Sequence, residues 1–181
     1  MRPNSTFFGV QLVLAMITAA PACASMDKLL RVGPTATPPI VDGALLDRCW
    51  QTATMASGFV TNYGEWPRAQ TTGYVTYDDT AIYIAFRCNT TAASAVTSKT
   101  TANDDEGIFG DSSVEIFLDT NHDRTAYYQF VINSIGTHYE GYIKPDDGIR
   151  EAQWNPQWEV RAQTFADHWT AEMRIPFASL A

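Results

Sequence analysis

A two-residue alternation of apolar and polar side chains, repeated in seven segments, is the feature that most constrains the fold of this chain. In one segment Ile82, Ile84 and Phe86 face one side, and Tyr83, Ala85 and Arg87 face the other. Successive side chains of a strand point to opposite faces, so each segment is predicted to be a strand that buries one face. The seven segments are 72–77, 81–88, 113–119, 127–133, 137–143, 158–164 and 169–175.

The connections between these strands indicate how the strands are arranged. Asp78, Asp79 and Thr80 form a predicted tight hairpin turn, and the longer connectors are rich in Gly, Asp, Asn and Pro. A single short helix is predicted, over residues 45–53. Strands with one apolar face and no alternating helices bury those faces by packing two sheets together. The predicted fold class is therefore all-β, a two-sheet antiparallel β-sandwich that is jelly-roll-like.

Length and composition exclude several classes of protein. The chain has 181 residues, 45% of them hydrophobic, which is expected for one folded domain and not for a disordered chain. Its formal net charge of -8 is unfavourable for binding a phosphate backbone, so we expect no nucleic-acid partner. We expect the domain to be monomeric.

The N-terminus has the pattern of an export signal. Arg2 precedes an apolar run over 7–20, which is too short to span a bilayer, and small residues follow up to Ala24. A signal peptide over residues 1–24 is predicted, which would make the protein periplasmic, extracellular or associated with an outer membrane. A buried N-terminal helix and a lipoprotein signal with lipidated Cys23 are the alternatives.

The sequence divides into three parts, the signal peptide and two parts that follow it. Residues 25–39, rich in Pro and Thr, are predicted to form a linker or an extended lead-in, and residues 40–181 the sandwich. No transmembrane helix is expected in the mature part. Because the chain stops at Ala181 near a predicted strand and bend, we expect a domain truncated at its C-terminus, the first of a longer protein.

Two cysteines remain after removal of the signal. Cys49 and Cys88 could form a disulfide in an exported protein, closing a loop of about 40 residues and stabilising the fold by about 3–4 kcal/mol. Two buried thiols are an equally good interpretation. Without clustered histidines the pair has no zinc signature.

No pattern in the sequence indicates a catalytic site. Hydrolysis of a glycoside needs two carboxyl groups at a defined separation, which sequence does not supply. The three histidines have neither a nucleophile elbow nor metal-ligand spacing nearby. We predict no catalytic residues, although many carboxylates were considered: Asp104, Asp105, Glu106, Glu115, Glu140, Asp146, Asp147, Glu159 and Glu172.

A calcium site is predicted just after one strand. Asp119, Asn121 and Asp123 supply oxygen ligands at alternate positions, which suits a hard cation such as calcium in a structural role. The loop is not an EF-hand, because Arg124 stands where that motif needs glycine. The alternative is a turn capped by its own side chains.

Aromatic residues carry the remaining signal. Trp66 and Trp154 lie in polar loops beside prolines, where a flat apolar ring can cover the C–H face of a sugar. They could equally fold back over a sheet edge. Trp50, Trp158 and Trp169 are predicted to lie in the core, from their positions in the short helix and in the strands.

Four motifs in order resemble carbohydrate-binding module family 9. The opening Ile40-Val41-Asp42-Gly43, with Leu46-Asp47 and Trp50, is similar to the family's start, although Arg48 replaces its usual acid. The hairpin and two strands that also match are 77–87, 111–119 and 168–177. Together the motifs cover about 140 residues.

The resemblance implies a non-catalytic sandwich that binds sugar, is commonly attached to an extracellular glycoside hydrolase in polysaccharide catabolism, and often carries calcium. Family members clamp a terminal sugar between two tryptophans with polar help. Trp66 and Trp154 are the implied pair with Trp158 as substitute, and Arg87 and Asn155 are the implied hydrogen-bonding residues. The full-length protein would then carry activity toward O-glycosyl compounds.

Two other functions stay open. Similar domains precede outer-membrane barrels without an assigned sugar. The module also resembles haem-binding sandwich domains of exported cytochromes, for which Met55, Met173 and His138 would be the candidate iron ligands.

Overall fold

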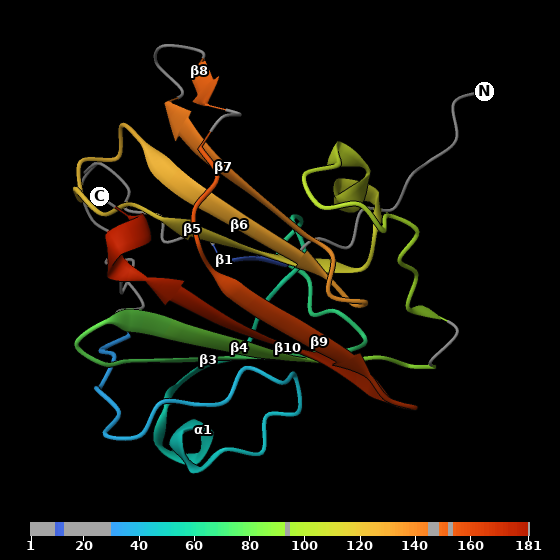
Figure 1. Ribbon diagram of the computed structural model, residues 1–181. Helices are drawn as coiled ribbons and strands as arrows, with labels where there is room; N and C mark the ends of the chain where they lie inside the picture. Colours follow the sequence, from blue (N-terminus) through green and yellow to red (C-terminus); the bar gives the residue numbers. More distant parts are fainter. Residues whose placement is uncertain (1–9, 13–29, 93–94, 145–148, 152–153, 181) are drawn as a thin grey trace, which may run out of the picture.

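The computed structural model describes residues 10–12, 30–92, 95–144, 149–151 and 154–180. Two five-stranded sheets pack face to face, with the connecting loops at their ends and edges (Figure 1). This arrangement confirms the predicted β-sandwich. All seven predicted strands are present, with ends that move by one residue at most.

The first sheet contains the chain's central hairpin. Its strands are ordered β2 (Thr54–Ala56), β3 (Thr71–Tyr77), β4 (Ala81–Asn89), β10 (His168–Pro176) and β9 (Glu159–Thr164), and every neighbouring pair is antiparallel. The predicted turn between β3 and β4 is confirmed. The carboxylate of Asp78 accepts hydrogen bonds from the N–H groups of Thr80 and Ala81 at 2.7 and 2.9 Å.

The second sheet is ordered β1 (Val10–Leu12), β5 (Ser113–Leu118), β6 (Tyr127–Asn133), β7 (His138–Lys144) and β8 (Ile149–Glu151). β1 runs parallel to β5, while the other pairs are antiparallel. β1 lies within the predicted signal peptide, most of which is outside the described residues, so the export signal stays a prediction. Of the predicted lead-in, residues 30–39 are described, and Pro34 forms a bridge to Tyr77 on β3.

The main core lies between the two sheets. Alternate residues of β4 and β10 meet alternate residues of β6 there, as the two-residue pattern predicts. Trp169 is 5% exposed and belongs to this core, which confirms its predicted place. The fully buried side chains here include Phe86, Ile116, Phe130, Ile132, Met173 and Ile175.

The prediction that each strand buries only one face is wrong for the central strands. The short helix α1 (Arg48–Thr52) covers the outer side of the first sheet, where Trp50 packs with Tyr83 and Ala85 of β4. The 3-10 helix η2 (Glu106–Gly110) covers the outer side of the second sheet through Ile108. Because these short elements cover the sheets, β4 and β6 are buried on both faces. A further 3-10 helix, η4 (Phe177–Ser179), follows β10.

The carboxylate of Glu172 attaches α1 and the segment before it to the first sheet. It accepts hydrogen bonds from Trp50 Nε1 at 2.7 Å and from the N–H groups of Gly43 and Asp42 at 2.7 and 3.0 Å. Gly43 has a φ of +85°, and a Cβ there would lie 3.1 Å from the backbone of Ala162. Glycine is therefore needed for this close approach.

The predicted disulfide is not formed. Cys49 and Cys88 are both buried free thiols. Cys49 belongs to α1 and packs on the outer side of the first sheet, whereas Cys88 points into the core between the sheets. The body of the sheet separates the two sulfur atoms, so the alternative of two buried thiols fits the structure. Burial raises the pKa of the Cys88 thiol to about 12.

Candidate functional site

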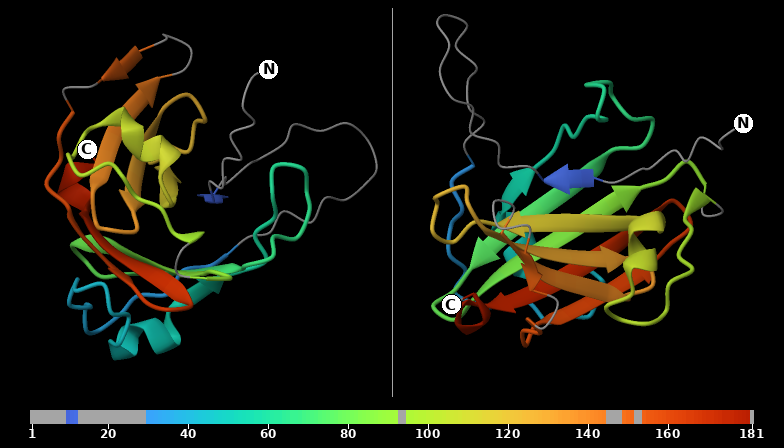
Figure 2. Two further views of the ribbon diagram at one scale, coloured as in Figure 1. Left: turned by 90° about the vertical axis from the view of Figure 1, so that its right-hand side faces the viewer. Right: turned by 90° about the horizontal axis from the view of Figure 1, so that it is seen from above.

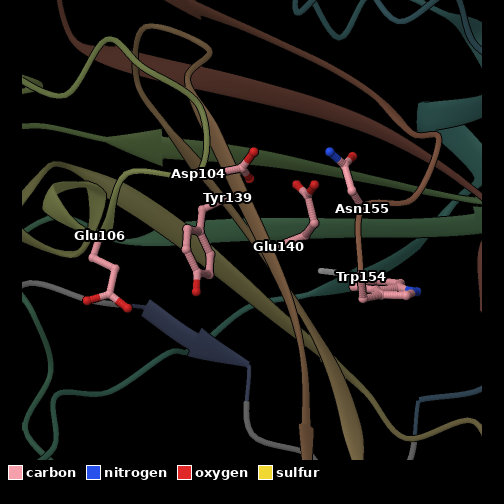
Figure 3. Close-up of a pocket in the computed structure, with 6 residues that line it drawn as sticks. All are labelled: Asp104, Glu106, Tyr139, Glu140, Trp154 and Asn155. Atoms are coloured by element: carbon pink, nitrogen blue, oxygen red, sulfur yellow. The ribbon is translucent and has the colours of Figure 1, made fainter. Parts of the chain in front are cut away.

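A small pocket of about 170 Å³ opens at the edge of the sandwich where β7 lies. β8 pairs only with residues Tyr142–Lys144 of β7, so among the described residues the first half of β7 has no strand on that side. The segment 154–158, which leads into β9 of the other sheet, passes this edge (Figure 1). The pocket is lined by Asp104, Glu106, Tyr139, Glu140, Trp154 and Asn155 (Figure 3).

One aromatic wall of the pocket is anchored in the core. The ring of Trp154 packs against Tyr128 and Phe130 of β6, with ring centroids 4.8 and 5.6 Å apart. Tyr139 lies on the other side of β7, where its ring meets that of Phe109 edge to face at 5.2 Å. Both aromatic residues are thus held by packing before any ligand arrives.

Three carboxylates reach the pocket from two segments. Asp104 precedes η2, Glu106 begins it, and Glu140 lies on β7. In Figure 3 the carboxylates of Asp104 and Glu140 gather near the amide of Asn155, while the Glu106 carboxylate lies beyond the ring of Tyr139. The pocket therefore combines flat apolar surface with many hydrogen-bond acceptors.

Glu140 is the most constrained of the three acids. Its side chain lies on the inner face of β7, only 7% exposed, and its Oε2 accepts a hydrogen bond from Trp158 Nε1 at 3.0 Å. Burial raises the pKa of Glu140 to about 7; the Trp158 hydrogen bond opposes this rise, and the charge of Asp104 adds to it. Trp158 also packs on Phe130 and on His138, whose pKa burial lowers.

The structure brings together some of the sugar-binding residues that the sequence predicted. Trp154 and Asn155 both line the pocket, and Trp158 stands behind it as the partner of Glu140. The predicted core position of Trp158 is confirmed in part, since its ring packs against the core from the edge.

Trp66 and Arg87 are not part of this pocket. Trp66 is 72% exposed in the loop after β2, the opposite edge strand of its sheet, and Figure 2 shows loop 57–70 on the far side of the molecule from β7. Arg87 lies on the outer face of β4 and donates from Nη1 to His168 Nε2 at 2.7 Å. The five predicted residues therefore do not form one platform.

The sequence analysis missed four lining residues as ligand contacts: Asp104, Glu106, Tyr139 and Glu140. A signal for one of them was available. Period two over 137–143 puts Glu140 on the same face as Tyr142, which packs against the core, and a glutamate on the core face of a strand is unusual enough to indicate a special role.

The predicted calcium residues lie on one turn. The carboxylate of Asp119 accepts the N–H of Arg124 at 2.8 Å, and Asp123 Oδ1 accepts the N–H of Thr125 at 2.8 Å. These contacts match the alternative of a self-capped turn. In the part of the chain that is described, no three His, Cys, Asp or Glu side chains are grouped to hold a metal ion. Calcium at Asp119, Asn121 and Asp123 stays a prediction.

The candidate iron ligands occupy different surroundings. Met55 lies on the outer face of β2 and is 56% exposed, so it does not point between the sheets. Met173 is fully buried among aliphatic core residues, and His138 packs against Trp158. The placement of Met55 removes it from an iron site inside the sandwich. No helix among the described residues is long and apolar enough to cross a membrane.

Fold and pocket together define a two-sheet β-sandwich module with a small acidic and aromatic pocket at one edge. Residues 41–181 match the family model described as "Carbohydrate family 9 binding domain-like", so the chain belongs to that family. This confirms the resemblance found in the sequence. No curated protein matches the chain.

Solved structures show the same fold at low sequence identity. A family 9 carbohydrate-binding module from Caldicellulosiruptor kristjanssonii, solved in complex with cellotriose, is 17% identical with a TM-score of 0.57. The match covers 80% of this chain and 66% of that one, just under two thirds of its length. A complex of such a module with glucose is 16% identical, with 80% and 67% covered and a TM-score of 0.56. A Bacteroides uniformis protein is 16% identical, with 82% and 71% covered and a TM-score of 0.61.

Proposed function

We propose that this chain is a non-catalytic carbohydrate-binding module that takes the end of a sugar chain into the pocket beside β7. The observation that carries the proposal is the joint lining of one pocket by an anchored Trp154 ring and by hydrogen-bonding groups on two other segments, the loop 104–106 and β7. The flat ring suits the apolar C–H face of a pyranose, while carboxylates and an amide suit its hydroxyls.

The size of the pocket favours one sugar ring over a long stretch of chain. Its volume of about 170 Å³ is below the roughly 300–1,000 Å³ of pockets that enclose drug-sized ligands. Membership of the family and the solved relatives in complex with cellotriose and glucose support the assignment to carbohydrate.

The residues have separate roles in this proposal. Trp154 stacks on the ring, Asn155 donates a hydrogen bond, and the acids accept hydrogen bonds from hydroxyls. Trp158 does not contact sugar but positions Glu140 through its hydrogen bond. Because affinity in such a shallow, wet site is modest, we expect dissociation constants in the micromolar to millimolar range, about -4 to -8 kcal/mol.

The wider setting is also a proposal. The N-terminal sequence supports export to the periplasm, the cell surface or the medium, and the family supports a link to polysaccharide breakdown, with the module attached to a glycoside hydrolase. The solved family 9 modules extend beyond the matched part, so the activity of the whole protein is not assigned by this fold.

Two tryptophans on opposite edges allow a matched test. Titration calorimetry with cellotriose, glucose and xylan oligosaccharides should show binding by the wild-type protein and about 1–3 kcal/mol weaker binding by Trp154→Ala, as for loss of a packed aromatic contact. Trp66→Ala removes an exposed ring in loop 57–70, far from the pocket, and should bind like the wild type.

A second variant separates binding from folding. Trp154 also packs on the core, so Asn155→Ala, which removes an exposed side chain, should weaken binding while the melting temperature stays within about 1–2 °C. If binding is lost with Trp66→Ala and kept with Trp154→Ala, the sugar site lies at the β2 edge. If the intact protein binds no sugar, the assignment to carbohydrate is wrong.

A further inference from the structure

The side chains that line the pocket include acidic groups but no basic ones. Three of its six lining residues are carboxylic acids, and the lining set contains no lysine, arginine or histidine. Asp104 and Glu106 belong to the exposed acidic run Asp104-Asp105-Glu106, and the fold brings this run to Glu140 of β7.

The acids are held in place by the backbone around them. The N–H of Asp104 donates to the carbonyl of His138 at 3.1 Å, and the N–H of His138 donates to Asn103 Oδ1 at 3.2 Å, which fastens this loop to β7. Asp105 caps η2 by accepting the N–H of Gly107 at 2.8 Å, which sets the position of Glu106. Trp158 holds the carboxylate of Glu140, and the backbone contacts hold the loop that carries the other two acids.

These charges already oppose one another. The Asp104 carboxylate acts on Glu140 strongly enough to raise its pKa further, beyond the effect of burial. Two nearby basic groups have other contacts: Arg161 Nη1 of β9 donates to the carbonyl of Val160, although its charge also acts on His138, and Lys144 Nζ of β7 stands over the Tyr142 ring at 5.0 Å. His138, also on β7, is favoured in its neutral form by burial, which lowers its pKa. A positive ligand would relieve the repulsion and a negative one would add to it.

Hydrogen bonding also favours a positive ligand over a negative one in this pocket. Ionised carboxylates only accept hydrogen bonds, and the donors among the lining side chains are the amide of Asn155, the indole N–H of Trp154 and the hydroxyl of Tyr139. A neutral sugar hydroxyl can donate to these acids, and an ammonium group donates three times. The carboxylate of a sugar acid would meet acceptors of its own charge.

We propose that the pocket selects sugars by charge: it binds amino sugars more tightly than neutral sugars of the same shape, and it rejects uronic acids. The inference rests on the proposed function and names the class of sugar within it. The carrying observation is that Asp104, Glu106 and Glu140 line the same pocket as the Trp154 ring, with no basic residue among the lining side chains.

Three trisaccharides with the same β-1,4-linked gluco stereochemistry provide the test: cellotriose, the glucosamine trisaccharide and the glucuronic acid trisaccharide. Calorimetric titration of the whole chain at pH 7 and low salt, where Glu140 with its pKa of about 7 is partly ionised in the free protein, should give about five- to tenfold tighter binding of the glucosamine trisaccharide than of cellotriose. The glucuronic acid trisaccharide should bind at least about tenfold more weakly than cellotriose. In 0.5 M NaCl both differences should shrink, because salt screens the charges.

A pair of variants separates the pocket from the overall negative charge of the protein. Glu106→Gln should reduce the ratio of the two affinities, amino sugar over neutral sugar, about threefold or more. Glu65→Gln removes the same charge from the exposed loop at the opposite edge and should leave that ratio as in the wild type.

The outcomes distinguish this inference from the proposed function. If cellotriose binds and the three ligands have equal affinities, or the uronic acid binds best, selection by charge is overturned while carbohydrate binding stands. An equal loss of preference in Glu65→Gln would also overturn it, because the effect would then come from net charge. If none of the three ligands binds, both proposals fail.

Discussion

Glu140 provides the sharpest test of the pocket's structure, because its ionisation is linked to folding. The side chain is 7% exposed, and burial raises its pKa to about 7 from an ordinary value of 4.5. Between these two pH values the folded protein holds a proton that the unfolded chain releases. The contribution to stability is therefore fully present below about pH 4.5 and is lost as the pH rises to about 7.

The size of this loss follows from the two pKa values. At about 1.4 kcal/mol for each pH unit, the interval from 4.5 to about 7 corresponds to about 3 kcal/mol of unfolding free energy. Glu140→Gln keeps the shape of the side chain and an oxygen for Trp158 Nε1 but has no proton to lose. We expect the variant to match the wild type near pH 4.5 and to exceed it by about 3 kcal/mol above pH 7.5.

Urea unfolding followed by tryptophan fluorescence at pH 4.5, 5.5, 6.5 and 7.5 measures this difference. Burial lowers the pKa of His138 in both proteins, so its effect cancels in the comparison. Glu65→Gln removes an exposed carboxylate from loop 57–70 and controls for the loss of one negative charge. A difference between Glu140→Gln and the wild type that stays constant with pH would refute the reasoning.

Three further predictions address the core, the cysteines and the calcium loop. Trp169→Ala should lower the free energy of unfolding by about 3–5 kcal/mol through a cavity between the sheets, and a loss below 1 kcal/mol in urea unfolding would contradict its core position. Protein that begins at Ser25, denatured without reductant, should titrate two thiols, from Cys49 and Cys88. A titration that finds no thiols would show that the two cysteines form a disulfide. If calcium binds Asp119, Asn121 and Asp123, chelation should lower the melting temperature, and Asp119→Ala should abolish that change. An identical melting curve in chelator and in added calcium would remove the site.

The sandwich was predictable because its strands are long and strongly periodic. β6 matches its predicted range at both ends, and the carboxylate of Asp78 caps the hairpin as its turn sequence indicates. The three-residue strands β2 and β8 were missed, since three residues are too few to display a period. The sequence analysis also did not predict that short helical elements cover the outer faces of both sheets. The 3-10 helix η2 has one fully buried residue, Ile108, and shows no helical repeat.

The site was less predictable than the fold because it depends on which loops lie at the same edge of the sandwich. Aromatic residues in polar loops were recognised from sequence, and two tryptophans of similar setting, Trp66 and Trp154, were assigned to one platform. The order of strands puts their loops at opposite edges of the sandwich. Alternation assigns each residue to a face of a sheet, but the pairing of strands, which decides the edge, comes from contacts distant in sequence.

The two buried glutamates show how structure separates a supporting acid from a binding one. Burial raises the pKa of both. Glu172 accepts three hydrogen bonds and is covered by the segment 42–50. Glu140 lines the pocket and accepts one hydrogen bond among the described residues, from Trp158.

This contrast predicts opposite results for the same substitution. Glu172→Gln places an amide against three N–H donors and should destabilise the fold by about 2–3 kcal/mol, while cellotriose affinity at a temperature where the protein is folded stays unchanged. Glu140→Gln should leave the fold at least as stable and should change the preference for amino sugars. If the two variants alter stability and sugar preference alike, the carboxylate of Glu140 supports the sandwich and does not face a ligand.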